Sequence, residues 1–227
     1  MRSAQSIVFQ LVASGDPAAF RVRCDLRKSD CLRLSLAVPS IDSFLGGGFP
    51  CGAITEIFGG QSSGKTTLAQ ALVARVVRSG AFAAWIDLPN AFLPEKPSDR
   101  VLWIAPRDRV TAMRAAEHVL EAGGFRVLIL DLGASASSRS AVPTSRWIRL
   151  ARLAERRDAV ILILSAVHAA GAFAALSLEA RAQHRRFAGS PGACPVFEGV
   201  ESSLRLHRSK HEALMGSSIG LRAVTED

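Results

Sequence analysis

Short apolar runs alternate along the chain with longer segments whose apolar residues recur at three- and four-residue spacing. The runs are typical of buried strands, and the longer segments are typical of amphipathic helices. After residue 175 the pattern changes to strands and loops without a clear helix. It therefore predicts a mostly parallel sheet flanked by helices, with antiparallel strands added at the C-terminal end. The expected strands are residues 53–58, 81–87, 101–104, 126–131 and 159–164, and the expected helices are 65–79, 108–122 and about 144–157.

The length of 227 residues suits one domain with a single buried core. Residues 1–33 have mixed polarity and scattered charge, so we interpret them as an N-terminal appendage to a core domain at residues 34–227. No run of 18 uncharged apolar residues occurs, so we expect no membrane-spanning helix and a cytoplasmic protein. The four cysteines show no metal-ligating spacing and are expected to be reduced thiols.

Positive charge gathers in the second half of the chain. The formal net charge is +8, and residues 139–210 hold 12 basic side chains against five acidic ones. A surface of this kind is typical of proteins that bind polyanions such as nucleic acids. A solvated surface rich in arginine explains the composition equally well.

The most specific motif is a glycine-rich loop between an expected strand and an expected helix. It matches the pattern G-x-x-x-x-G-K-[ST], in which backbone N–H groups and the positive end of the helix dipole bind phosphate oxygens. The lysine reaches the β- and γ-phosphates, and the following threonine hydroxyl binds Mg²⁺. The motif predicts a binding site for a nucleoside triphosphate. Its residues are Gly59, Gly60, Gln61, Ser62, Ser63, Gly64, Lys65, Thr66 and Thr67.

Asp131 is the second candidate ligand for the metal. It ends the apolar run Val127-Leu-Ile-Leu-Asp131, which we expect to form a strand next to the one that precedes the loop. In phosphate-loop proteins a carboxylate in this position holds Mg²⁺. A simple cap of the strand end is the alternative.

The segment 34–87 carries a family resemblance. Its Ser-x-x-x-Asp helix, its Gly-Gly-hydrophobic-Pro turn and the sequence SSGKTT resemble the RecA-like ATPase family, and the likeness continues more weakly to about Ala223. The short, divergent second half is similar to the ImuA-like members of that family, which are associated with SOS mutagenesis. The resemblance implies a RecA-type P-loop NTPase fold, ATP and Mg²⁺ as ligands, and a role in DNA repair or recombination. It also implies single-stranded DNA, RecA, a translesion polymerase or further copies of the chain as partners.

Departures from the family pattern concern hydrolysis. In the family, a glutamate that activates water follows the strand ending here at Asp87, and Pro89 occupies its position. Asp87 and Glu95 are nearby carboxylates, but a substitution for that glutamate is speculative. Ser165 and Ala166 replace a glutamine that senses the γ-phosphate. Since a general base contributes roughly 10²–10⁴-fold, we expect ATP binding with slow hydrolysis.

The expected DNA-binding loops, residues 132–143 and 166–174, are both short, which makes strand exchange by this chain alone doubtful. The main hypothesis is therefore a degenerate ATPase that acts by binding RecA, a polymerase or single-stranded DNA. The alternative is an active, DNA-dependent ATPase recombinase that forms filaments. A small-molecule kinase is a weaker third candidate, because the segment after the loop lacks an arginine-rich lid.

Several basic residues are candidates for contacts with other molecules. The resemblance places Arg208 and Lys210 where the family presents two cations to the ATP of a neighbouring molecule. The candidate DNA or partner contacts are Arg139, Arg146, Arg149, Arg152 and Arg156, of which the last four share one face of the expected helix. A solvated surface is the alternative for each group. Trp85 and Trp103 are expected to pack in strand cores, and Trp147 fits either the core or a contact.

Overall fold

A computed structural model describes residues 8–14, 33–92, 98–133, 142–188, 196–210 and 217–226. None of the helices in these ranges is long and apolar enough to cross a membrane. The helices are α1 (Pro39–Phe44), α2 (Lys65–Arg78), α3 (Arg109–Ala122) and α4 (Thr144–Arg157), with a short 3₁₀ helix at Gly171–Phe173. The strands are β1 (Val8–Ser14), β2 (Arg33–Leu34), β3 (Phe49–Pro50), β4 (Ile54–Phe58), β5 (Phe82–Asp87), β6 (Val101–Ile104), β7 (Phe125–Asp131), β8 (Val160–Ser165), β9 (Leu176–Ala188), β10 (Val196–Ser209) and β11 (Ser218–Glu226).

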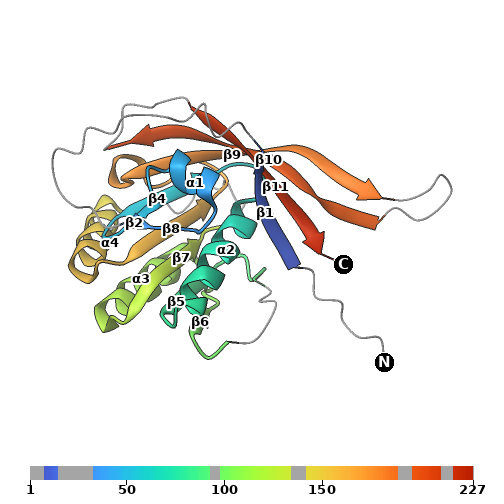
Figure 1. Cartoon of the computed structure of the whole chain (residues 1–227). Helices are drawn as coiled ribbons and strands as arrows, with labels where there is room; N and C mark the ends of the chain where they lie inside the picture. The colour runs from blue at the N-terminus through green and yellow to red at the C-terminus, as the bar shows by residue number, and fades with distance from the viewer. Residues whose placement is uncertain are drawn as a thin grey trace.

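Within the described residues the main sheet has nine strands in the order β1-β11-β10-β9-β4-β8-β7-β5-β6 (Figure 1). The strands from β9 to β6 run parallel to one another, and β10, β11 and β1 continue the sheet in antiparallel pairs. This confirms the predicted α/β fold with a mostly parallel sheet and antiparallel strands at its C-terminal end. Residues 8–14 pair with β11, and the division of the chain at residue 33 stays a prediction.

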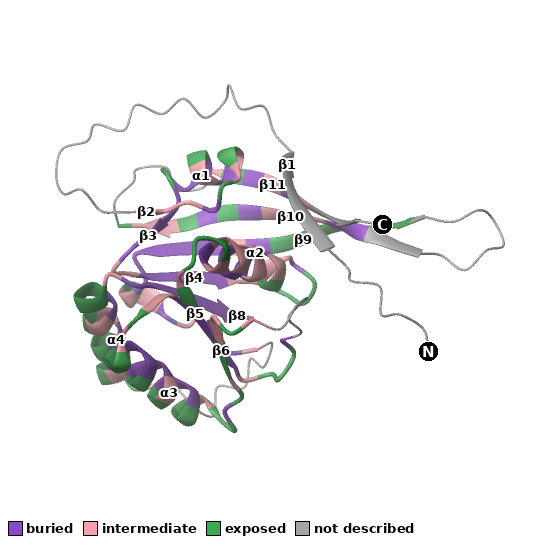
Figure 2. Ribbon diagram, turned by 60° about the horizontal axis from the view of Figure 1, so that its bottom comes forward, coloured by how far each residue is buried: buried purple, intermediate pink, exposed green. Residues whose placement is uncertain are grey.

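Two apolar layers cover the two faces of the sheet. One layer holds buried residues of α1 and α2, such as Leu68 and Leu72, and the other holds those of α3 and α4, such as Met113 and Leu150. Because both faces are covered, β7 from Val127 to Asp131 and all of β8 are buried at consecutive positions rather than at alternate ones. Figure 2 shows the central strands of the sheet as buried. The core thereby holds the carboxyl ends of the parallel strands at one rigid edge.

Two expectations about the strands are wrong. β7, which ends in Asp131, is not the neighbour of β4, because β8 lies between them and pairs with both. All six residues of β8 are buried, which suits it to the inner position. Trp103 is 51% exposed rather than buried, because β6 is the last strand of the sheet and lacks a neighbour on one side. Trp85 and Trp147 are both buried in the core.

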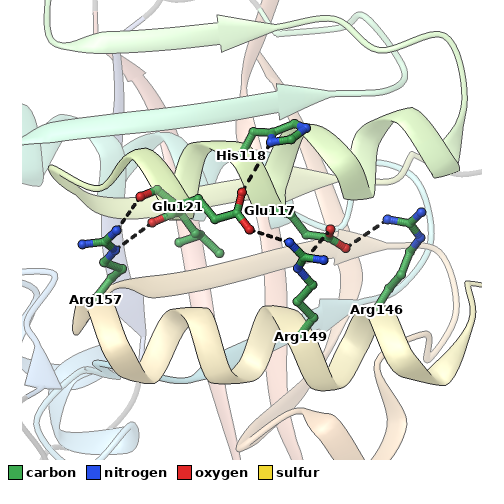
Figure 3. Close-up of polar contacts among 7 residues, drawn as sticks. Glu117, His118, Glu121, Arg146, Arg149 and Arg157 are labelled. Carbon is green, nitrogen blue, oxygen red and sulfur yellow. Dashed lines mark hydrogen bonds and ion pairs between the residues drawn. The ribbon is translucent and has the colours of Figure 1, made fainter.

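Ion pairs join α4 to α3 and involve half of the basic face predicted for α4 (Figure 3). Arg146 donates to the Glu117 carboxylate at 3.0 Å, and Arg149 lies 3.4 Å from the same carboxylate and 2.5 Å from Glu121. The Glu117 side chain is only 8% exposed. Arg146 and Arg149 therefore satisfy acidic groups of their own chain.

The two remaining arginines of this face, Arg152 and Arg156, are exposed. Among the described residues neither has an ion-pair partner. They remain available for a contact with another molecule, whereas Arg139 lies outside the described residues. Trp147, Leu150 and Ala154 form the buried side of α4, whereas Ile148 is 38% exposed.

We predict that Arg146→Ala lowers the free energy of unfolding by about 1–3 kcal/mol, because the buried Glu117 carboxylate loses a charged donor. Arg152→Ala, on the exposed side of the same helix, should change it by less than about 0.5 kcal/mol. Chemical denaturation of both variants measures the difference. Equal losses of stability in the two variants would show that the Arg146–Glu117 ion pair does not stabilise the fold.

Candidate nucleotide-binding site

The glycine-rich loop leaves the carboxyl end of β4 and enters α2 at Lys65. The Lys65 ammonium donates to the carbonyl oxygens of Gly59 and Gly60, both at 2.7 Å, and to the Ser63 hydroxyl at 3.1 Å. The residue before the helix, Gly64, supplies no side-chain cap, so the N–H groups of the first turn have no capping side chain. An uncapped helix start beside an ammonium group is suited to bind an anion.

The extended strands β9 and β10 run along one side of this loop. Gly59 has a φ of +154°, and a Cβ built on it would lie 2.0 Å from the carbonyl oxygen of Ala180 in β9. Gly64 has a φ of +82°, and its Cβ would lie 2.8 Å from the Ser202 hydroxyl in β10. No L side chain fits at these two positions, so both glycines are needed for the loop to rest against the sheet.

A cavity of about 230 Å³ opens at the loop. It is lined by residues 62–67 and, from the facing strands, by Arg185 and Val200. The Thr66 side chain is exposed. Six of the nine predicted phosphate-binding residues, 62–67, therefore line one open space and include the candidate metal ligand Thr66, whereas Gly59, Gly60 and Gln61 do not line it.

Asp131 lies at the same edge of the sheet, although β8 separates its strand from β4. Its Oδ1 accepts a hydrogen bond of 2.9 Å from the Gly133 N–H. The pKa of Asp131 is raised to about 6, chiefly by burial and also by the Asp87 carboxylate, against the lowering effects of the Gly133 N–H and the Lys65 charge. Burial lowers the pKa of Lys65, and Asp131 acts in the opposite direction. Because each charge influences the pKa of the other group, we infer that the Lys65 ammonium and the Asp131 carboxylate lie at the same site.

One carboxylate and one hydroxyl fit the way Mg²⁺ is held in phosphate sites, where waters and phosphate oxygens complete the coordination. Among the residues that the structure describes, no group of three or more His, Cys, Asp or Glu side chains could hold a metal by itself. Thr66 and Asp131 therefore remain the candidate ligands, and a nucleotide would have to supply the others.

The position expected for the water-activating base holds no titratable group. Pro89 lies beside the Asp131 region, since a Cβ on Gly133 would be 3.4 Å from the Pro89 side chain. Asp87 is buried, and its carboxylate accepts hydrogen bonds from the Ala91 and Phe92 N–H groups and from the Trp103 indole. Its acceptor sites are thus committed to the loop that follows β5. Glu95 lies outside the described residues.

The buried Glu56 in β4 was not singled out by sequence reasoning. Its Oε1 accepts hydrogen bonds from the Ala169 and Ala170 N–H groups at 2.5 and 2.9 Å, and its Oε2 lies 2.5 Å from His168 Nδ1. Glu56 therefore ties the strand before the loop to the segment after β8. The available signal was an acidic residue inside a short apolar strand directly before the phosphate loop.

Ser165, at the position expected for the γ-phosphate sensor, donates its hydroxyl hydrogen to the Val167 carbonyl at 2.8 Å. The side chain of its neighbour Ala166 has no hydrogen-bonding group. The segment that begins here is thus held by its own main chain and by Glu56.

Arg208 lies near the end of β10, Lys210 directly follows this strand, and Arg208 donates to the Gly171 carbonyl at 3.2 Å. Val200, which lines the cavity, is eight residues before Arg208 on the same strand, roughly 26 Å away at ~3.3 Å per residue. His207, next to Arg208, packs against Phe58, the residue before the loop, with ring centroids 5.3 Å apart. The expected role of Arg208 and Lys210 at the nucleotide of a neighbouring molecule stays a prediction.

Comparisons with known proteins agree with this geometry. A family model described as the RecA N-terminal domain matches residues 21–143. Three similar proteins bear the name Protein RecA. That of Borreliella afzelii (strain PKo) is 39% identical over 98 residues, covering 40% of this chain and 27% of the relative. That of Treponema pallidum (strain Nichols) is 37% identical over 117 residues, covering 47% and 29%. That of Picosynechococcus sp. (strain ATCC 27264 / PCC 7002 / PR-6) is 30% identical over 128 residues, covering 52% and 37%. The matched part is thus well under half the length of each relative.

We predict that Asp131→Asn stabilises the protein at pH 8. The pKa of Asp131 is raised from 3.8 to about 6 in the folded state, so its ionisation above pH 6 costs the folded state about 3 kcal/mol at most. The amide removes this cost and keeps the acceptor for Gly133. The gain should shrink as the pH falls from 6 toward 3.8, because folded Asp131 then becomes protonated.

Chemical denaturation at pH 8 and pH 4 measures this gain, with the exposed Asp99→Asn as the matched control. A variant that is less stable than the parent at pH 8 would contradict the assignment of Asp131 as a strained, buried charge. A carboxylate kept at the expense of stability is expected of a functional site.

Proposed function

Since this chain belongs to the RecA family, we propose that it binds ATP with Mg²⁺ at residues 59–67 and takes part in DNA recombination or repair. The observation that carries the proposal is the cavity at the start of α2, with Lys65 at its loop and Asp131 at the same sheet edge. The two glycines that no other residue can replace support the same reading, because they let the loop backbone face the cavity.

The residues present suit a triphosphate. The N–H groups at the start of α2 would bind phosphate oxygens. The Lys65 ammonium would give up its hydrogen bonds to Gly59, Gly60 and Ser63 and donate to oxygens of the β- and γ-phosphates instead. Thr66 and Asp131 would hold the Mg²⁺, which neutralises phosphate charge when bound. Burial makes each of these charge contacts stronger than it would be in water.

We further propose that hydrolysis is slow and that the chain acts mainly as a nucleotide-gated binding module. Pro89 has no proton-accepting group, and the Asp87 carboxylate already accepts three hydrogen bonds. More specifically, we propose that the chain is similar to the ImuA-like members of the family and takes part in SOS mutagenesis. Single-stranded DNA and RecA are the partners it favours, and Arg152 and Arg156 are the basic residues best placed for them.

The second candidate is an active recombinase that assembles on single-stranded DNA. It is favoured by Arg208 and Lys210, two cations at the end of β10 that do not line the cavity of their own chain and could stabilise phosphate charge at the site of a neighbour. A translesion polymerase as partner remains a hypothesis without a supporting contact among the described residues.

We predict that the chain binds Mg·ATP and that Lys65→Ala weakens binding by about 10- to 100-fold, as expected for the loss of a half-buried cation that donates hydrogen bonds to phosphate. Arg78→Ala is the matched control, because Arg78 is an exposed cation in the last turn of the same helix. Titration calorimetry with and without Mg²⁺ gives both affinities. Absence of Mg²⁺-dependent binding by the parent chain would refute the proposed function.

We predict that Pro89→Glu accelerates single-turnover ATP hydrolysis, by up to roughly 10²–10⁴-fold if the new carboxylate acts fully as a general base. Pro89→Gln, which has a similar shape and no base, should leave the rate unchanged. Both rates are measured with labelled ATP, with and without single-stranded DNA. Rapid DNA-stimulated hydrolysis by the parent chain would instead favour the active recombinase.

A further inference from the structure

Among the residues that the structure describes, Arg185 is the one basic residue outside the phosphate loop that lines the cavity. It belongs to β9 and lies directly opposite Val200 of β10, and Val200 lines the same cavity. The same two strands contact the loop at Gly59, through Ala180, and at Gly64, through Ser202. Figure 2 shows β9 and β10 passing beside the start of α2. Residues of β9 and β10, which are not part of the loop motif, therefore form one side of the cavity.

The side chains of Arg185 and its neighbour Arg186 in β9 point to opposite faces of the sheet. Successive side chains of a strand point to opposite faces of the sheet. Arg186 lies 3.3 Å from Glu201, the residue that follows Val200, so this pair occupies the face away from the cavity. Among the residues whose side chains the structure describes, Arg185 has no ion-pair partner. Of two adjacent arginines, one is neutralised and the other faces the loop.

The two cations at this cavity differ in chemistry. Lys65 provides a compact ammonium at the loop, whereas Arg185 provides a planar guanidinium that can donate two parallel hydrogen bonds to one phosphate group. A ligand that uses both must carry several negative charges spread over a chain of oxygens. Polyphosphates meet this requirement, and a neutral or singly charged ligand does not.

We propose that Arg185 is a nucleotide-binding residue that pairs with phosphate oxygens of the nucleotide held by residues 59–67 of its own chain. This inference rests on the proposed ATP binding and adds a residue that the loop motif does not contain. Because both cations belong to one molecule, the contact requires no neighbour. It differs in this respect from any contact of Arg208 or Lys210, which lie at the other end of β10.

The test compares Mg·ATP affinities of Arg185→Ala and Arg186→Ala, measured by calorimetry on dilute protein. Arg185→Ala should weaken binding by about 10- to 100-fold, the range for one charge-assisted contact. Arg186→Ala should stay within about twofold of the parent, and Arg185→Lys should fall between them, since an ammonium supplies the charge without the fork. Thermal melting of the variants checks that the fold is retained.

Repeating the titrations with ADP and AMP identifies what Arg185 touches. We place the contact at the β- or γ-phosphate, so the loss caused by Arg185→Ala should become smaller as these phosphates are removed. An equal loss for all three nucleotides would overturn the proposal, because the contact would then be with the α-phosphate, the ribose or the base. If the parent chain binds and Lys65→Ala does not, while Arg185→Ala binds like Arg186→Ala, the role of Arg185 is refuted and the proposed function stands. If the parent chain binds no nucleotide, both fail.

Discussion

The attraction between Lys65 and Asp131 is the interaction on which the site depends. Parallel strands end at one edge of the sheet, so a cation after β4 and a carboxylate at the end of β7 meet there despite the strand between them. Burial disfavours the charged form of both groups, because it raises the pKa of Asp131 and lowers that of Lys65. Each charge opposes the effect of burial on the other. The site thereby keeps two opposite charges at a place where phosphate and Mg²⁺ can bind them.

The antiparallel strands contribute more than an extension of the sheet. β9 approaches the loop so closely that Gly59 has no room for a Cβ atom, and β10 does the same at Gly64. This packing holds the loop backbone in place before any ligand binds, which reduces the ordering that binding would otherwise require. It also brings the outer half of β9 alongside the cavity. The shape of the site is therefore set jointly by the loop motif and by strands more than 100 residues later in the chain.

Much of this arrangement was predictable from the sequence, because the phosphate loop and its flanking elements are local in the chain. The order of the strands in the sheet was not predictable. A fully apolar run such as β8 indicates an inner strand, but it does not specify which two strands lie beside it. Exposure of Trp103 follows from the edge position of β6, which a four-residue run does not reveal. Helical spacing placed Arg146 beside Arg152 on one face, yet it could not show that Glu117 of another helix binds only the first. Arg185 was missed for the same reason, since tertiary packing alone brings it to the loop.

The three hydrogen bonds that the Asp87 carboxylate accepts argue against Asp87 acting as the general base in place of the glutamate whose position Pro89 occupies. To accept a proton from water, its carboxylate would have to turn from the Ala91 and Phe92 N–H groups that it now binds. Each donor left without a partner in a buried position costs about 1–3 kcal/mol. That cost would be added to the barrier for hydrolysis, and it is comparable with the roughly 10²–10⁴-fold that a general base contributes. A rearrangement of Asp87 would therefore return little net acceleration, which agrees with the slow hydrolysis proposed above.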